Sequence, residues 1–462
     1  VVGGIYDFII ATVGWWNESV TSRCLEWGQA LADKTKLVFK INTGAAVLGM
    51  GYIVGLKYAL IICCGSVAVW WVIVPAISWL FPDLVVSAGS SSVTASQASA
   101  EQIFQYAKSI GIGGIAMAGI IGIFKSRKII MGAVGLAAQE MKGKGKSDTA
   151  VPRTQKDLPM KIIAVGSLLT LAAILLFFYF GVMEGNLLFT LTGVLLVAVI
   201  AFLFTTVAAN AIAIVGSNPV SGMTLMTLIL ASVIMVAVGL KGPVGMVAAL
   251  IMGGVVCTAL STAGSFITDL KIGYWLGSTP KKQETFKFLG TLVSAATVAG
   301  VIMILNDTYG FTSGQLAAPQ ANAMAAVIEP LMSGAGAPWL LYGIGAALAI
   351  LLTLFNVSAL AFALGMFIPL ELNLPLLVGG LINWYVTTRS SKEQVNKERG
   401  EKGTLIASGF IAGGALMGVV SAALRFGGIS FDYSAWWANP ASEWLSLLMY
   451  VLLIICLLYT SD

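Results

Sequence analysis

Uncharged apolar runs, each long enough to cross a lipid bilayer as a helix, recur along this chain. Residues 187–215 form one such run and contain no charged side chain. A transmembrane helix needs about 20 mostly apolar residues, whereas the strands of a membrane β-barrel alternate apolar and polar residues over short segments. None of the runs shows that alternation. We therefore predict an all-α, polytopic membrane protein with about 12 transmembrane segments, short broken helices included.

The composition supports this class and argues against others. The chain is 58% hydrophobic and 10% charged, whereas soluble domains contain about 25% charged residues. The net charge of +5 lies mostly in three loops, so we expect no nucleic-acid partner. Histidine is absent from the sequence, which removes the commonest metal ligand and the usual proton carrier near neutral pH. We therefore expect no cofactor, no metal site and no Ser-His or zinc-dependent catalysis, and predict that the protein is not an enzyme.

The apolar runs give the expected order of the spans. Residues 1–42 are mixed and predict a surface helix or loop. Long spans are expected at 58–80, 103–124, 160–182, 187–215, 223–240, 243–262, 288–305, 338–355, 403–424 and 443–455. Shorter apolar pieces are expected at 43–56 and 319–333, and a proline-broken pair at 357–371 and 374–388.

One uncharged, helix-breaking stretch lies between two of these spans. Residues 216–224 read Gly-Ser-Asn-Pro-Val-Ser-Gly-Met-Thr, residue types that end helices and free backbone groups for other partners. At membrane depth such a break is tolerated only where protein buries it or where it lines a polar cavity. A broken transmembrane helix is typical of a transporter binding site. The alternative is a short turn at the membrane interface.

Basic residues predict the orientation of the spans. In 125–161 they outnumber acidic residues nine to three, and 389–402 is also basic, whereas 81–102 and 426–442 contain no Lys or Arg. Residues 263–287 are polar and end in three lysines, Lys281, Lys282 and Lys287. Because basic loops stay on the cytoplasmic side, we expect 125–161, 263–287 and 389–402 to be cytoplasmic.

Parts of the chain repeat. An offset of 314 residues aligns 51–57 with 365–371, Gly65 with Gly379 and Trp70 with Trp384, and an offset of 299 aligns 109–121 with 408–420. Chance matches of Gly and Ala are common in such chains. However, the basic and the uncharged loops follow in opposite order in the two copies, which predicts opposite orientations in the membrane. Inverted repeats are characteristic of secondary transporters.

The repeat predicts the division of the chain. We expect 1–158 to hold the end of the first repeat plus the basic loop 125–161, 159–455 to form the second repeat, and 456–462 to be a non-native tail. The counterpart of the break at 216–224 would then precede Val1. We therefore expect the sequence to be an N-terminally truncated fragment.

Several stretches together resemble the oligopeptide transporter (OPT) family of bacterial type, whose relatives include the yellow-stripe-like carriers of metal chelates. They are Asn-Thr-Gly at 42–44, Gly-Tyr-Ile-Val-Gly-Leu at 51–56, Asn-Pro-Val-Ser-Gly-Met-Thr at 218–224, Asp-Leu-Lys-Ile-Gly-Tyr-Trp-Leu-Gly-Ser-Thr-Pro at 269–280, Pro-Leu-Glu-Leu-Asn-Leu-Pro at 369–375 and Ala-Ser-Gly-Phe-Ile-Ala-Gly at 407–413. Each motif alone is weak, but their order and spacing cover most of 42–424.

The resemblance implies a proton-coupled symporter of small oligopeptides or peptide-like substrates in the cytoplasmic (inner) membrane of a bacterium. The expected partners are the substrate, protons and the lipid bilayer, and a homo-oligomer is compatible with the sequence. One alternative is a siderophore or metal-chelate transporter on the same scaffold. Another is a subunit of a membrane complex without transport activity, which would lack a central polar cavity.

The break supplies the candidate substrate-binding residues, Asn218, Pro219, Ser221, Gly222 and Thr224. Their side chains and freed backbone groups could bind a peptide's amides and termini, and a helix that begins near Ser221 would direct its positive end at a carboxylate. The alternative is that Asn218 and Ser221 only cap that helix.

Charged residues in apolar surroundings are the candidates for proton coupling or gating, because charge at membrane depth is costly and usually faces a partner or a cavity. Without histidine, coupling needs a carboxylate of raised pKa, and we expect Glu371 first, then Glu329, then Asp269. The repeat pairs Glu371 with Lys57, so we predict that these two approach each other across the pseudo-twofold axis. The alternative places them at opposite interfaces.

Overall fold

The chain folds into two compact units. The computed structural model describes residues 1–88, 91–125, 131, 152–215, 220–311, 319–332, 338–429, 436 and 439–461. The first unit combines Val1–Gly114, Ala299–Pro319 and Leu341–Asp462, and the second combines Ile115–Val298 and Gln320–Leu340. The units are discontinuous in sequence, so they differ from the predicted division at residue 158. The predicted division separates the two sequence repeats, whereas the two units group residues by their contacts. The units therefore do not test the predicted division, which stays a prediction.

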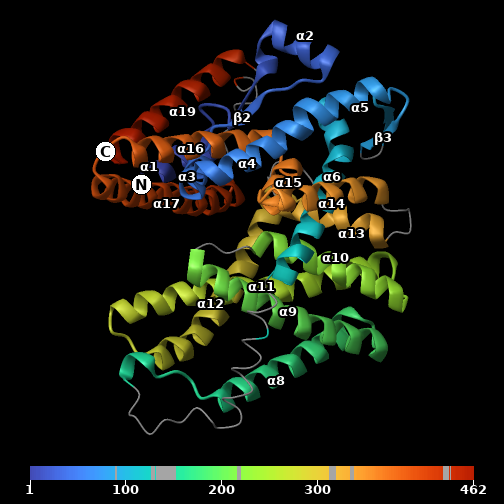
Figure 1. Ribbon diagram of the computed structural model, residues 1–462, viewed down its shortest axis with the longest axis vertical. Helices are drawn as coiled ribbons and strands as arrows, with labels where there is room; N and C mark the ends of the chain where they lie inside the picture. Colours follow the sequence, from blue (N-terminus) through green and yellow to red (C-terminus); the bar gives the residue numbers. More distant parts are fainter. Residues whose placement is uncertain are drawn as a thin grey trace. The chain divides into compact units, whose positions relative to one another are not determined.

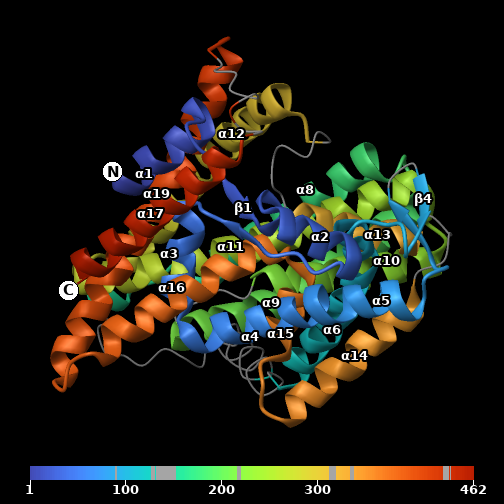
Figure 2. The ribbon, with the colours of Figure 1, turned by 90° about the horizontal axis from the view of Figure 1, so that it is seen from above.

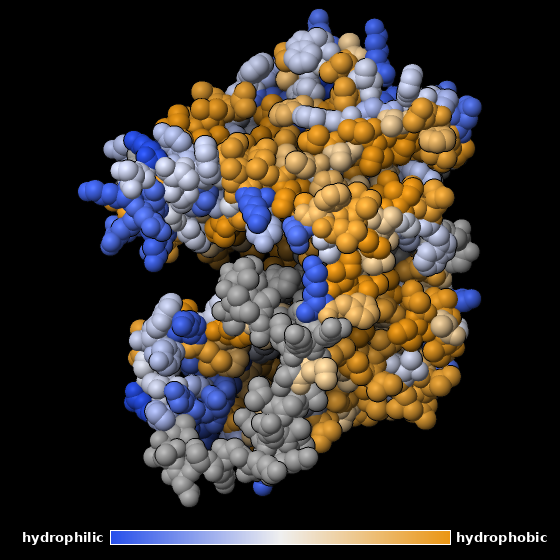
Figure 3. Space-filling view, in the orientation of Figure 1, coloured by the Kyte–Doolittle hydropathy of each residue, from blue (hydrophilic) through white to orange (hydrophobic). Residues whose placement is uncertain are grey.

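The predicted all-α, polytopic class is confirmed. In the described residues, seven helices are long and apolar enough to cross a membrane: Leu56–Leu80, Arg153–Val182, Leu187–Thr206, Gly242–Trp275, Pro280–Tyr309, Glu393–Phe426 and Pro440–Tyr459. Shorter apolar helices accompany them at Val2–Val13, Ala45–Val54, Thr227–Val238 and Trp339–Leu354. Hydrophobic side chains cover most of the face shown in Figure 3, as expected for a surface that contacts lipid.

The first unit is built mainly from helices of the two ends of the chain (Figure 1). Its helices are α1 (Val2–Phe8), η1 (Ile9–Val13), η2 (Ser22–Cys24), α2 (Glu26–Thr35), α3 (Ala45–Val54), α4 (Leu56–Val67), η3 (Ala68–Ile73), α5 (Val74–Leu80), the first part of α6 (Ala100–Lys125), most of α14 (Trp339–Leu354), α15 (Ala359–Phe367), α16 (Leu370–Thr388), α17 (Glu393–Phe426) and α19 (Pro440–Ser461). Two two-stranded antiparallel sheets lie in segments where no strand was expected: β1 (Ser19–Thr21) with β2 (Lys40–Asn42), and β3 (Val85–Ala88) with β4 (Ser91–Thr94).

The second unit holds the middle of the chain. Its helices are η4 (Arg153–Gln155), α8 (Met160–Phe177), η5 (Phe178–Val182), α9 (Leu187–Val215), α10 (Val220–Val238), α11 (Gly242–Trp275), most of α12 (Pro280–Tyr309) and most of α13 (Pro319–Met332). Helices α9, α10 and α11 pack on one another around buried Leu228, Met235 and Met252. The described side chains of α12 are all at least partly exposed, so this apolar helix offers its surface to lipid.

Three predicted boundaries are wrong. The predicted polar segment 263–287 and the predicted charged loop 389–402 are largely helical, because α11 and α17 continue as helices beyond their apolar parts. Lys, Glu and Gln, which enrich the start of α17, are good helix formers. The proline-broken pair divides at Ile368 and Pro369, and not after 371, because Pro375 lies inside α16.

A twofold relation of contacts organises the first unit. Helices α3 and α4 pack against α16 and α15 (Figures 1 and 2). A Cβ atom added to Gly51 would lie 2.4 Å from the carbonyl oxygen of Leu376, and one added to Gly365 would lie 1.9 Å from that of Ile62. The offset of 314 relates Gly51 to Gly365 and Ile62 to Leu376, so the two contacts are equivalent in the repeat. The same offset relates a second pair of contacts, in which Gly65 meets the carbonyl of Phe362 and Gly379 meets that of Leu48.

The relation extends to the second pair of repeated helices. Gly49 of α3 lies against Phe410 of α17, with 3.3 Å between an added Cβ and the Phe410 Cβ. The equivalent residues, Ala363 of α15 and Gly111 of α6, are also in contact, at 3.0 Å from an added Cβ to the Ala363 carbonyl oxygen. These contacts use the two offsets, 314 and 299, on which the repeat was predicted. Helices α3, α4 and α6 of the first copy therefore pack against helices α15, α16 and α17 of the second copy.

Candidate functional site: a polar cavity at a broken helix

The break between α15 and α16 is stabilised by one buried amide. Helix α15 ends at Phe367, Ile368 is extended, and α16 begins after Pro369. The fully buried Asn373 donates hydrogen bonds from Nδ2 to the carbonyl oxygens of Gly365 and Ile368, each at 3.1 Å. Carbonyls at a helix end lack partners within the helix, so Asn373 satisfies two groups that the break exposes.

Glu371 lies in the first turn of α16 and forms an ion pair with Lys40 of β2. Both side chains are partly buried, Glu371 with 29% of its side chain exposed. The N-terminal end of a helix favours a negative charge, so α16 and Lys40 together stabilise the carboxylate. The cation that pairs with Glu371 therefore comes from strand β2. This strand lies in the part of the chain, residues 1–42, for which the sequence predicted only a surface helix or loop.

This ion pair borders a cavity of about 160 Å³, here named the Glu371 cavity. Residues of β2, η3, α6 and the α15–α16 break line it: Val38, Lys40, Trp70, Glu101, Phe104, Gln105, Pro369, Leu370 and Glu371. All of them belong to the first unit. The cavity therefore joins a carboxylate, an ammonium and an amide at a helix break, which is where transporters bind substrates.

An aromatic pair forms one wall of the Glu371 cavity. Trp70 stacks on Phe104, with 4.4 Å between ring centroids. Trp70 lies in η3, a π-helical turn, a local distortion that is frequent at functional sites. Its indole Nε1 is buried and has no hydrogen-bond partner within the described residues. Buried donors are normally paired, so this nitrogen is available to a ligand or a water.

A second ion pair closes the edge of the cavity. Arg23 of η2 lies 2.9 Å from Glu101 in the first turn of α6. Burial opposes the ionisation of Glu101, but the hydrogen bond and the charge of Arg23 outweigh it, so the pKa of Glu101 lies below its usual range. Glu101 is therefore a carboxylate at neutral pH and offers a second negative charge to the cavity.

The predicted approach of Lys57 to Glu371 is not what the structure shows. Gly380 of α16 lies against Leu56, with 3.1 Å between an added Cβ and the Leu56 Cα. Lys57 is thus beside residue 380, nine positions beyond Glu371, which corresponds to about 13 Å along the helix. Residues related by the pseudo-twofold axis contact each other only close to that axis. The axis passes near the middle of the α4–α16 contact, whereas Lys57 and Glu371 lie at the starts of these helices. The partner of Glu371 is Lys40 instead.

The other charged candidates lie in the second unit. Asp269 of α11 forms an ion pair with Lys287 of α12 at 2.8 Å, and so connects two neighbouring helices. Glu329 lies exposed on α13. Glu371 belongs to the first unit, whereas Glu329 and Asp269 belong to the second, and the role of all three in proton coupling stays a prediction.

The predicted substrate-binding break lies partly outside the described residues. Asn218 and Pro219 fall outside them, whereas Ser221, Gly222 and Thr224 lie in the first turns of α10. Helix α9 is described as far as Val215. The role of these five residues stays a prediction.

Sequence reasoning missed a second partly buried acid, Asp7 of α1. Its Oδ1 accepts a hydrogen bond from the backbone N–H of Ala45 at 3.0 Å, at the start of α3. An added Cβ on Gly414 of α17 would lie 2.2 Å from its Oδ2. The carboxylate is thus enclosed by three helices and caps one of them. The signal in the sequence was that Asp7 is an isolated acidic residue among the apolar residues at the start of the chain.

Comparison with known proteins gives the family. The chain matches the family model described as OPT oligopeptide transporter protein over residues 1–425. It is also 26% identical over 471 aligned positions to a protein of Haemophilus influenzae named "Putative oligopeptide transporter", covering 90% of this chain and 72% of that protein. The matched range includes the α15–α16 break and the residues that line the Glu371 cavity. This multi-pass membrane protein therefore belongs to the OPT oligopeptide transporter family.

Proposed function

We propose that the protein takes up small oligopeptides together with protons across the bacterial cytoplasmic membrane, and that the Glu371 cavity binds the peptide. Membership of the OPT family supports peptide transport. The observation that carries the site is the combination, at one helix break, of two carboxylates, an ammonium and an unpaired buried indole N–H. A zwitterionic peptide presents the complementary groups.

In this proposal the ion pair between Glu371 and Lys40 exchanges partners on binding. The peptide carboxylate replaces Glu371 beside Lys40, and the peptide ammonium binds Glu101. Protonation of Glu371 removes its attraction for Lys40 and so frees the ammonium for the substrate. This coupling of proton and peptide binding is a linkage, because each ligand favours the state that binds the other. Residues 216–224 remain proposed as a further substrate-facing element.

The test is accumulation of radiolabelled tri-alanine in proteoliposomes under an imposed inward proton gradient. Wild-type protein is expected to accumulate the peptide only when the gradient is present. Glu371→Gln keeps the side chain's size but cannot change its charge, and it is expected to abolish gradient-driven accumulation while retaining peptide exchange at zero gradient. Accumulation by Glu371→Gln equal to wild type would exclude Glu371 as the coupling group. A ferric chelate in parallel vesicles tests the chelate alternative, and chelate uptake without peptide uptake would overturn the proposed substrate.

A further inference from the structure

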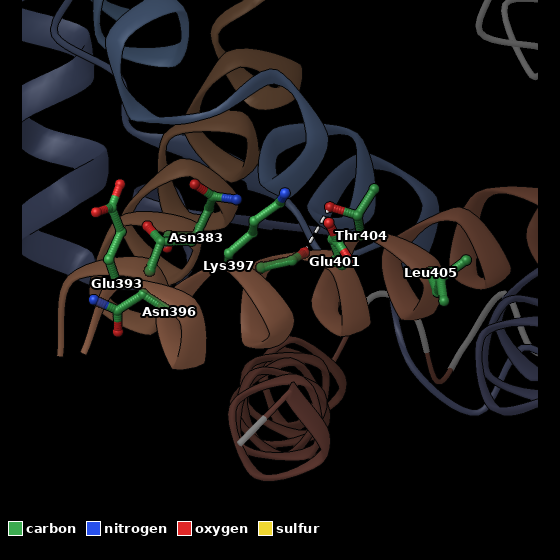
Figure 4. Close-up of a pocket in the computed structure, with 9 residues that line it drawn as sticks. Asn383, Glu393, Asn396, Lys397, Glu401, Thr404 and Leu405 are labelled. Carbon is green, nitrogen blue, oxygen red and sulfur yellow. Dashed lines mark hydrogen bonds between the residues drawn. The ribbon is translucent and has the colours of Figure 1, made fainter. Parts of the chain in front are cut away.

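A second hollow of the first unit lies between α16 and α17 (Figure 4). It has a volume of about 760 Å³ and is here named the Asn383 groove. Its lining is Asn383, Thr387, Glu393, Asn396, Lys397, Gly400, Glu401, Thr404 and Leu405. Figure 4 shows its acidic, basic and amide side chains along the start of α17, and Thr404 Oγ1 donates to the carbonyl of Gly400 at 2.8 Å.

The groove occupies the position that the twofold relation assigns to the Glu371 cavity. The offset of 299 converts Glu101 and Gln105, which line the Glu371 cavity, into Gly400 and Thr404, which line the groove. At the offset of 314, Trp70 of the cavity corresponds to Trp384, which directly follows Asn383 of the groove in the sequence. Residues of η3 and α6 line the Glu371 cavity, and residues of the equivalent helices α16 and α17 line the groove.

The distribution of basic residues predicts that the two hollows face opposite sides of the membrane. The groove is lined from the basic start of α17, where Lys397 and its basic neighbours mark the cytoplasmic side. The Glu371 cavity lies at the start of α6, next to 81–102, which has no Lys or Arg. An inverted repeat produces this arrangement because the operation that exchanges the copies also exchanges the faces.

The hollows differ because only one of them is covered. The segment 19–42, which we name the cap, lies over the Glu371 cavity, and the contacts that attach it include two ion pairs and two hydrogen bonds. These are the ion pairs Lys40–Glu371 and Arg23–Glu101, the hydrogen bond from Trp71 Nε1 to the Val38 carbonyl at 3.1 Å, and that from the Thr21 N–H to Glu443 at 3.0 Å. In the second copy, α14 and α15 are joined by residues 355–358 alone, so no counterpart of the cap exists there. The described ion pairs also include none at Lys397.

From this difference we infer that the Asn383 groove is a cytoplasmic binding site for the transported peptide, the twofold counterpart of the Glu371 cavity, and that the structure represents the state open to the cytoplasm. The inference rests on the proposed peptide transport. Lys397 supplies the cation for the peptide carboxylate, and Glu393 or Glu401 receives the ammonium. The peptide leaves through the groove while the cap closes the Glu371 cavity.

The experiment measures the labelling of single cysteines by a membrane-impermeant maleimide. The background variant lacks the five native cysteines and must still accumulate tri-alanine. Thr387→Cys reports on the groove. Glu398→Cys is the matched control, because Glu398 is exposed on the same helix α17 and lies outside the lining. Both are compared in inside-out and right-side-out vesicles, with and without tri-alanine.

Thr387→Cys is expected to react in inside-out vesicles and to be protected from right-side-out labelling. Tri-alanine at ten times its Kd should slow the reaction about tenfold, because only unoccupied protein reacts. Glu398→Cys should react from the same side at a rate that the peptide does not change. Labelling of Thr387→Cys from the outer side, or no peptide effect in vesicles that accumulate the peptide, would overturn the groove as a binding site. Absence of accumulation in every variant would instead refute the proposed peptide transport.

Discussion

Gly51 of α3 touches the backbone of Leu376 in α16, and a Cβ at position 51 would come within 2.4 Å of the Leu376 carbonyl oxygen. The symmetric contact between Gly365 and Ile62 is as close, at 1.9 Å. Both glycines allow two helix backbones to approach where any side chain would separate them. The broken helices of the two copies thus depend on each other for their packing.

Gly51→Ala and Gly365→Ala are therefore expected to destabilise the protein to a similar degree, each by about 1–3 kcal/mol, because overpacking forces a backbone to move. Thermal unfolding in detergent, followed by tryptophan fluorescence, measures the effect. Gly409→Ala in α17 is the control, since nothing lies within 4 Å of its added Cβ, and it should leave the midpoint unchanged or raise it. An unaffected Gly365→Ala would contradict the symmetric contact.

Asn373→Leu should destabilise the protein by about 1–3 kcal/mol, the usual cost of leaving buried polar groups without partners. The variant removes the donor to the Gly365 and Ile368 carbonyls and keeps the branching at Cγ. The comparison is Asn383→Leu, whose amide lines an open groove. Equal thermal midpoints for Asn373→Leu and wild type would show that the break does not need this amide.

Lys40→Met is expected to abolish most peptide uptake with little loss of stability. A partly exposed ion pair contributes at most about 1 kcal/mol, whereas the proposed peptide carboxylate loses its cation. Initial uptake rates and thermal midpoints should be measured on the same preparation. Lys34→Met, on the exposed surface of α2 in the same cap, serves as the matched variant. Normal uptake by Lys40→Met would remove this residue from the site.

Asp7→Asn is expected to retain gradient-driven uptake, in contrast to Glu371→Gln. The asparagine oxygen can still accept the hydrogen bond from Ala45 that Asp7 accepts, so the start of α3 keeps its cap. The same proteoliposome assay compares the two variants. If Asp7→Asn loses coupling and Glu371→Gln keeps it, then Asp7 is the proton carrier and Glu371 is not.

The contact between Arg23 and Glu101 should make stability depend on pH. The pKa of Glu101 is lowered in the folded protein, so the contact stabilises it above the ordinary pKa of 4.5 and is lost as the pH falls through the lowered value. Arg23→Gln should therefore lower the thermal midpoint at pH 7, and its difference from wild type should shrink below pH 4.5. A difference that is constant with pH would show that Arg23 acts through packing alone.

Much of the helical architecture could be predicted because it depends on local composition. A run such as 187–215 has no alternative in a bilayer to a helix that satisfies its own backbone groups. The offsets of the repeat were visible as well, since close helix contacts require glycine at fixed positions such as 51 and 365. The charged start of α17 was misread as a loop because the end of an apolar run marks the membrane boundary and not the helix boundary.

The partners of the charged residues could not be predicted. The sequence by itself determined the membrane class, the family resemblance and the offsets that align the repeated glycines. Only the tertiary structure decided that Glu371 pairs with Lys40, 331 positions earlier in the chain, and that Lys57 lies elsewhere along the helix pair. The physical reason is that hydropathy acts on each segment separately. An ion pair instead depends on the crossing of α4 and α16 and on where the cap between α1 and α3 lies.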